Sequence, residues 1–182
     1  MKPFRLHELK TRDPGSKRIN VVVDTPKGSH NKFKYDEALG LFRLSRILPA
    51  GMRFPYDFGS VPRTRAEDGD ALDVLVLMDA PTFTGCLIAV RLVGVLRSEQ
   101  KEKRMTVRND RLLAVAETPV NRPSIRTITD VGSGRLSEIE QFFVSYNRAH
   151  KREFTPTGRL GPRAADKLLI KAMRAYEESG DN

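Results

Sequence analysis

The stretch EDGDALD (Glu67–Asp73), which runs directly into the apolar segment VLVLM (Val74–Met78), decides most of what can be expected of this chain. Three aspartates fall within its last six residues, in a glycine-containing loop that leads into a segment typical of a buried strand. Carboxylates packed this closely repel one another and are rarely buried without compensation. A divalent cation would resolve the conflict, and Mg²⁺ favours carboxylate oxygens together with waters and substrate phosphates. The alternative is a solvated acidic turn in which Asp73 caps the strand or pairs with an arginine.

The first two-thirds of the chain contains segments with the residue types and patterns of strands. Besides the segment after Asp73, the β-branched, alternating or continuously apolar segments are Ile19–Thr25, Lys32–Asp36, Leu41–Leu48, Cys86–Leu96 and Arg111–Val115. Gly40 separates the second and third of these, which predicts a hairpin. The charged run Arg97–Arg104 is expected to form a flexible loop.

The last third changes to a helical period. Leu136, Ile139, Phe143 and Tyr146 fall on one helical face, and Ser137 with Glu140 predicts a capping box at the helix start. A second helix is predicted from about Pro162 to Ser179, ending at Gly180.

Strands followed by helices predict an α+β fold that is mainly β. We expect one domain over 1–182, with residues 1–18 as an N-terminal extension and 163–182 as a C-terminal helix and tail.

The net charge indicates the kind of partner, and the cysteine content indicates the cellular location. The 182 residues include 32 Lys plus Arg against 23 Asp plus Glu, a formal net charge of +9 that suggests an anionic partner: nucleic acid, a membrane surface or a phosphorylated small molecule. The single cysteine, Cys86, excludes an internal disulfide and a Cys-based zinc cluster and fits a cytoplasmic location. No apolar run approaches the roughly 20 residues of a membrane helix, so we expect no membrane partner and no signal peptide.

Several motifs occur in order along roughly residues 19–150. Val22–Phe33 reads VVDTPKGSHNKF, Phe54–Gly59 reads FPYDFG, and the acidic stretch contains DGDALD. They resemble the E-I-P-K-G-x-x-N-K-Y strand end, the Y-P-x-[ND]-Y-G segment and the D-G-D-P-x-D signature of the soluble family I inorganic pyrophosphatases. The same resemblance extends to Arg46, Gly85, Val93–Leu96 and Phe142–Tyr146.

This resemblance implies a fold and an activity. The fold is a five-stranded, OB-like β-barrel flanked by two C-terminal helices. The activity is the Mg²⁺-dependent hydrolysis of pyrophosphate to two phosphates by a metal-activated water. Prokaryotic members are usually homohexamers, so we expect a homo-oligomer. The chemistry suits the residue types, because phosphoryl transfer is catalysed chiefly by positioning and charge neutralisation.

The resemblance also implies roles for particular residues. Asp68, Asp70 and Asp73 would hold the activating metals, and Asp70 would orient or deprotonate the attacking water. The residues that would bind the two phosphoryl groups are Lys32, Arg46, Arg111 and Tyr146, of which Lys32 and Arg46 are also assigned to catalysis. Asp24 takes the place of a family glutamate that organises metal-bound water.

The chain departs from the family pattern at several of these places. A glutamate becomes Lys34, tyrosines become Phe54 and Phe58, lysines become Arg111 and Asn147, and a metal-binding aspartate becomes Asn109. Asp110 and Glu99 are the candidates to replace the missing acidic ligands, and the predicted metal set therefore includes Asp110.

These departures keep a second function open. A catalytically impaired barrel of this family would bind a phosphorylated ligand or nucleic acid, since a fold does not guarantee a function. Nucleic acid is the less expected partner, because no basic strand rich in aromatic residues offers a stacking platform. Tyr146 suits a core role and a phosphate-binding role equally well, and Lys32 and Arg46 also fit the solvated face of a strand.

Overall fold

The computed structural model describes residues 5–16, 18–102, 105–117 and 124–180. Its strands are β1 (Ile19–Thr25), β2 (Asn31–Asp36), β3 (Leu41–Ile47), β4 (Asp57–Ser60), β5 (Asp73–Leu77), β6 (Leu87–Glu102), β7 (Met105–Arg108), β8 (Arg111–Ala116) and β9 (Glu153–Leu160). Its helices are α1 (Ser133–Ala149) and α2 (Pro162–Ser179), with short 3₁₀ turns at η1 (Leu6–Glu8) and η2 (Ile128–Val131). No helix in the described part of the chain is long and apolar enough to cross a membrane.

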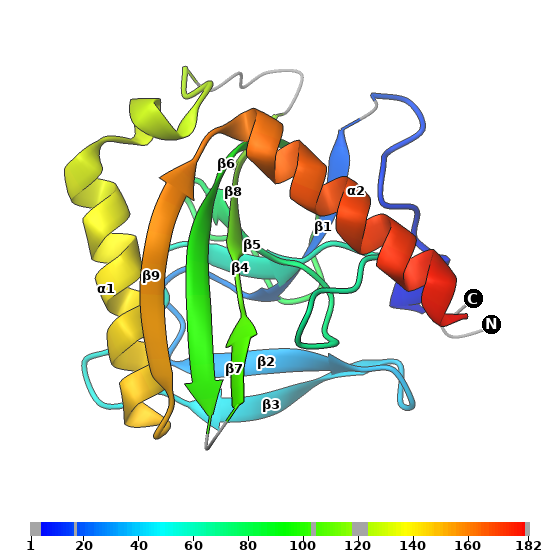
Figure 1. Cartoon of the computed structure of the whole chain (residues 1–182). Coiled ribbons are helices and arrows are strands. Elements are labelled where there is room, and N and C mark those ends of the chain that lie inside the picture. Colours follow the sequence, from blue (N-terminus) through cyan, green and yellow to red (C-terminus); the bar gives the residue numbers. More distant parts are fainter. Residues whose placement is uncertain (1–4, 17, 103–104, 118–123, 181–182) are drawn as a thin grey trace.

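Five strands pair in a closed ring in the order β1-β4-β5-β8-β6, and β6 returns to β1. All pairs are antiparallel except β5 with β8. The hairpin β2–β3 lies below the ring as a separate two-stranded sheet (Figure 1). The closed ring and its two helices confirm the predicted OB-like, mainly β architecture.

Two apolar cores lie on the two faces of the ring strands. Along β5, Val74 and Val76 belong to one core and Leu75 and Leu77 to the other, because successive side chains of a strand point to opposite faces. Helix α2 contributes to the first core, and α1, which lies alongside β9 in Figure 1, contributes to the second. Burial on both faces explains why β5 is continuously apolar. The start of β5, and with it Asp73, is therefore firmly placed.

Several local predictions are confirmed. The hairpin forms as expected, with Lys32 opposite Arg46 in the pairing of β2 with β3. Helix α2 has the predicted bounds and ends at Gly180, which adopts the left-handed conformation typical of a helix C-cap.

The prediction of a flexible loop over Arg97–Arg104 was wrong for Arg97–Glu102, while residues 103 and 104 lie outside the described residues. Strand β6 continues to Glu102, pairing with β7 on one side and β9 on the other. This segment has the alternating burial of a strand, because Ser98 and Gln100 are buried while Glu99 is exposed. Its many charged residues hide this alternation in the sequence. Strand β9 was not predicted either, since Pro156 and Gly158 normally weaken a strand.

The predicted capping box was also wrong. Helix α1 begins earlier, at Ser133, directly after Gly132. The Ser137 hydroxyl donates to the Ser133 carbonyl at 3.0 Å, and the Glu140 carboxylate accepts hydrogen bonds from Arg159 on β9. The two residues therefore belong to the interior of the helix.

We predict that Gly94→Ala lowers the free energy of unfolding by about 1–3 kcal/mol, the usual effect of overpacking a core. A Cβ atom at Gly94 on β6 would lie 2.6 Å from the Leu160 carbonyl oxygen and 2.7 Å from Cβ of Ile128. Gly134→Ala is the control, because its Cβ would meet nothing within 4 Å. In a helix this exchange adds up to about 1 kcal/mol of stability. Urea denaturation measures both variants, and equal effects would contradict the prediction.

Candidate active site

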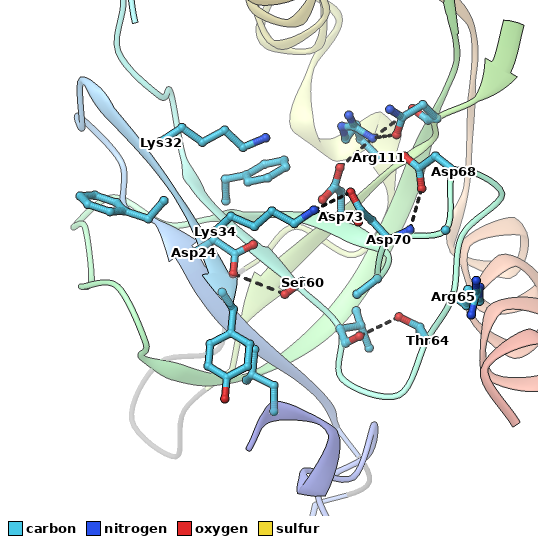
Figure 2. A pocket seen from close by; sticks show the side chains of 18 of the residues that line it. Asp24, Lys32, Lys34, Ser60, Thr64, Arg65, Asp68, Asp70, Asp73 and Arg111 are labelled. Atoms are coloured by element: carbon cyan, nitrogen blue, oxygen red, sulfur yellow. Dashed lines mark hydrogen bonds and ion pairs between the residues drawn. The ribbon is translucent and has the colours of Figure 1, made fainter. Parts of the chain in front are cut away.

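A cavity of about 1020 Å³ opens between the hairpin β2–β3, the loop that precedes β5 and the ends of β6, β7 and β8. Figure 2 shows labelled side chains of β1, β2, β5, β8 and the loop before β5 that line it. Eight of the nine residues assigned from sequence line it: Asp24, Lys32, Arg46, Asp68, Asp70, Asp73, Arg111 and Tyr146. The fold therefore brings together residues that are up to 122 positions apart (146 − 24).

Four carboxylates form the acidic side of the cavity. Asp24 lies near the end of β1, Asp68 and Asp70 lie in the loop, and Asp73 is the first residue of β5. The loop closes on itself, because the backbone N–H of Asp70 donates to Oδ1 of Asp68 at 3.2 Å. Between these two residues Gly69 has φ +88°, a conformation that side-chain-bearing residues rarely adopt.

The acidic side carries more negative charge than its surroundings favour. Burial, together with the charge of Asp73, raises the pKa of Asp24 to about 8. Burial and the same neighbour raise the pKa of Asp68. A carboxyl group with a raised pKa gains stability from a cation beside it. The carboxyl groups of Asp24 and Asp68 would therefore be stabilised by more positive charge than the protein itself supplies.

Two side-chain cations do neutralise part of the acidic side. Nζ of Lys34 donates to both carboxylate oxygens of Asp70, at 2.9 and 3.1 Å (Figure 2). The guanidinium of Arg111 lies 2.9 Å from Oδ2 of Asp73. The interpretation in which Asp73 pairs with an arginine is thus realised. Among the described residues no three His, Cys, Asp or Glu side chains are already arranged as a metal-ligand set.

Aromatic rings support the cations on the basic side. Nζ of Lys32 lies 5.3 Å from the ring centre of Phe58 and 5.5 Å from that of Tyr146. Cζ of Arg111 lies 6.0 Å from the same Phe58 ring and 5.2 Å from that of Phe143. A cation over an aromatic face is attracted by the ring quadrupole. Phe58 lacks a hydroxyl, but its ring positions two cations.

The end of the cavity beside Arg111 is lined by amides. Nδ2 of Asn109 donates to Oε1 of Gln100 at 2.9 Å, and the Asn109 side-chain oxygen accepts a hydrogen bond from Arg111. Both amide residues are buried. Gln100 was not predicted from sequence, because its place on the cavity side of β6 follows from the alternation of buried Ser98 and Gln100 with exposed Glu99, which only the structure shows.

The two candidate replacements for the missing acids point elsewhere. Asp110 accepts hydrogen bonds from the Ser98 backbone N–H at 3.0 Å and from Nε of Arg108 at 2.7 Å. Of the described residues around the cavity, Asn109 is a lining residue and Asp110 is not. Glu99 is exposed on the opposite face of β6 from Gln100. The geometry therefore does not favour Asp110 or Glu99 as a ligand at this site.

Tyr146 and Asn147 complete the wall at the end of α1. The Tyr146 hydroxyl is buried and finds no hydrogen-bond partner within the described chain, although its residue lines the cavity. Such an orphaned hydroxyl is available to a bound ligand. The Asn147 amide instead donates back to the Phe143 carbonyl at 2.9 Å.

The fold and the cavity define an OB-like domain with a charged site in which carboxylates face lysines and arginines. The family model for inorganic pyrophosphatase matches residues 21–177. The inorganic pyrophosphatase of Nostoc sp. is 35% identical over 159 residues, covering 87% of this chain and 92% of the relative. That of Geobacillus stearothermophilus is 32% identical over 163 residues, covering 90% and 96%.

Solved structures agree. The crystal structure of inorganic pyrophosphatase from Thermus thermophilus matches with a TM-score of 0.86 and 32% identity, covering 96% of this chain and 99% of that one. The chain belongs to the inorganic pyrophosphatase family, which is a family of enzymes.

We predict that Asp24 makes the metal-free protein less stable as pH rises. The folded protein holds the Asp24 proton up to a pKa of about 8, whereas the unfolded chain releases it near 3.8. Stability that depends on the protonated carboxyl is therefore complete below about pH 4 and is lost by about pH 8. Asp24→Asn stays neutral, so its stability advantage over the wild type should grow by about 2 kcal/mol or more across that range.

Urea denaturation of both proteins in chelator, at pH 5, 7 and 9, measures this difference. A constant difference at the three pH values would contradict the raised pKa of Asp24.

Proposed function

We propose that the chain hydrolyses inorganic pyrophosphate to two phosphates in a reaction that depends on Mg²⁺. The observation that carries the proposal is one cavity in which four carboxylates face Lys32, Arg46 and Arg111. Pyrophosphate carries several negative charges and needs cations around it, while a hydrolytic water needs a carboxylate to accept its proton. Membership of the inorganic pyrophosphatase family supports the same reaction.

The carboxylates of the acidic side fit a divalent cation. Asp68, Asp70 and Asp73 supply the hard oxygen atoms that Mg²⁺ prefers, and the pKa of Asp68 is raised by loss of hydration and by the neighbouring charge of Asp73. When bound, the ion lowers the pKa of a coordinated water and neutralises charge on the phosphoryl groups. Next to Asp73, Nη1 of Arg111 contacts both the Asp73 carboxylate and the Asn109 side-chain oxygen, so a neutral amide and a cation stand there in place of a further carboxylate.

The remaining roles fall to residues of the chain. Lys32 and Arg46 are paired across the β2–β3 hairpin and would bind one phosphoryl group, whereas Arg111 and the free Tyr146 hydroxyl would bind the other. Asp70 would accept the proton of the attacking water. Asp24, which remains close to Lys32 and Asp73, would order water near the metal.

One observation favours the second candidate, a barrel that binds a phosphorylated ligand without turnover. The carboxylate proposed as the base, Asp70, is engaged by Lys34 at 2.9 Å. The ion pair is exposed, with 60% and 62% of the two side chains accessible, and exposed pairs contribute only about 0–1 kcal/mol. Pyrophosphate entry can displace so weak a contact, which is why hydrolysis remains the preferred function.

Location and assembly are predictions of the same kind. We expect the protein to be cytoplasmic and to assemble from identical subunits, as a hexamer by family resemblance. Both expectations are consistent with the proposed function. Pyrophosphate and phosphate are the proposed ligands, and nucleic acid is not expected as a partner.

We predict that Asp70→Asn lowers the rate of phosphate release by about 100- to 10,000-fold, the usual contribution of a general base. The fold should be unaffected, because Asp70 is exposed in a loop. Asp166→Asn, on the exposed side of α2, is the matched control and should retain the wild-type rate.

The measurement is phosphate release from pyrophosphate with Mg²⁺ and with chelator. An unchanged rate for Asp70→Asn would remove Asp70 as the base. If the wild-type protein releases no phosphate with Mg²⁺, the proposal of hydrolysis is overturned in favour of the binding function.

A further inference from the structure

Lys34 contributes a largely exposed positive charge to the cavity. It lies two residues after Lys32 on β2, so both side chains project from the same face of that strand, and both line the cavity. In Figure 2 the Lys34 side chain extends over Asp24 towards Asp70, where its ammonium group contacts both oxygens. The Asp70 carboxylate therefore already has a cation as partner.

The two ion pairs of the cavity differ in how easily they separate. Arg111 is buried, holds the Asn109 side chain and lies against the Phe143 ring, so its contact with Asp73 is fixed. Lys34 and Asp70 are both largely exposed, and a lysine ammonium on a four-carbon chain reorients readily. Lys34 is thus the cation that can leave.

We propose that Lys34 is an internal competitor of the divalent cation: it holds Asp70 in the ligand-free protein and transfers to a phosphoryl oxygen when pyrophosphate binds, which frees Asp70 for the metal. The proposal rests on the proposed function. The ammonium group contacts the Asp70 carboxylate in this structure and could instead pair with a phosphate oxygen of a bound anion. A metal ion and the Lys34 ammonium group would repel each other at Asp70, and both would compete for the same carboxylate lone pairs.

This exchange couples the two ligands. Pyrophosphate draws Lys34 away and so strengthens metal binding, and by linkage the metal strengthens pyrophosphate binding by the same factor. Without Lys34, Asp70 would be open to metal even in the absence of an anion, and part of the coupling would vanish.

The test is isothermal titration of Mg²⁺ into metal-free protein without substrate. Lys34→Gln should bind Mg²⁺ about 3- to 10-fold more tightly than the wild type, because one nearby positive charge is removed. Lys34→Arg keeps the charge and should keep the weak wild-type affinity. Lys171→Gln is the matched control, since Lys171 forms a similar exposed pair at 2.8 Å with Glu67, next to the same loop but outside the cavity lining.

A second titration adds methylenediphosphonate, a diphosphate that cannot be hydrolysed. It should increase the Mg²⁺ affinity of the wild type by a larger factor than that of Lys34→Gln. Equal Mg²⁺ affinities for wild type and Lys34→Gln, or an equal gain in Lys171→Gln, would overturn the proposal.

The same experiments separate this proposal from the proposed function. Equal affinities combined with Mg²⁺-dependent phosphate release by the wild type would overturn the role of Lys34 alone. Absence of Mg²⁺ binding by both the wild type and Lys34→Gln would overturn the metal site and the competition together.

Discussion

The crowding of the carboxylates of Asp24, Asp68, Asp70 and Asp73 in one cavity, with loss of hydration and mutual repulsion, is the constraint on which the rest of the site depends. Four acids around one cavity cannot all ionise without positive charge near them. The protein supplies Arg111 at Asp73 and Lys34 at Asp70, but the pKa values of Asp24 and Asp68 remain raised. The site is therefore incompletely neutralised, which gives a divalent cation a favourable place to bind.

The ring of strands holds this unfavourable arrangement in place. Strand β5 is packed between two apolar cores, so Asp73 cannot withdraw into solvent without disturbing both. The closed order β1-β4-β5-β8-β6 also fixes Asp24 and Arg111 relative to Asp73. Apolar burial on both faces of the ring thus stabilises a fold whose charged cavity is costly by itself.

Aromatic rings lie beside some of the cations of the cavity. The Phe58 ring lies near both Lys32 and Arg111, and Phe143 supports Arg111 further. Replacement of a family tyrosine by Phe58 removes a hydroxyl but retains this platform. Lys34 instead contacts the exposed Asp70 carboxylate with its ammonium group. The cavity accordingly combines cations that lie over aromatic rings with Lys34, which is paired with an exposed carboxylate.

The sequence by itself determined the family resemblance, the hairpin, the bounds of α2 and eight residues that line the cavity. These features depend on local patterns and on motifs with a fixed order. Sequence did not reveal that Arg97–Glu102 continues β6, because its apolar content is low and its partner strand β9 contains Pro156 and Gly158.

Only the tertiary structure decided that Gln100 and Asn109 face the cavity while Glu99 and Asp110 do not. It also decided that Lys34, two positions from Lys32, reaches Asp70. The physical reason is that strand side chains alternate between faces, and a shift of one residue in register would reverse every one of them. That register is fixed by pairing between segments distant in sequence, which no local pattern encodes.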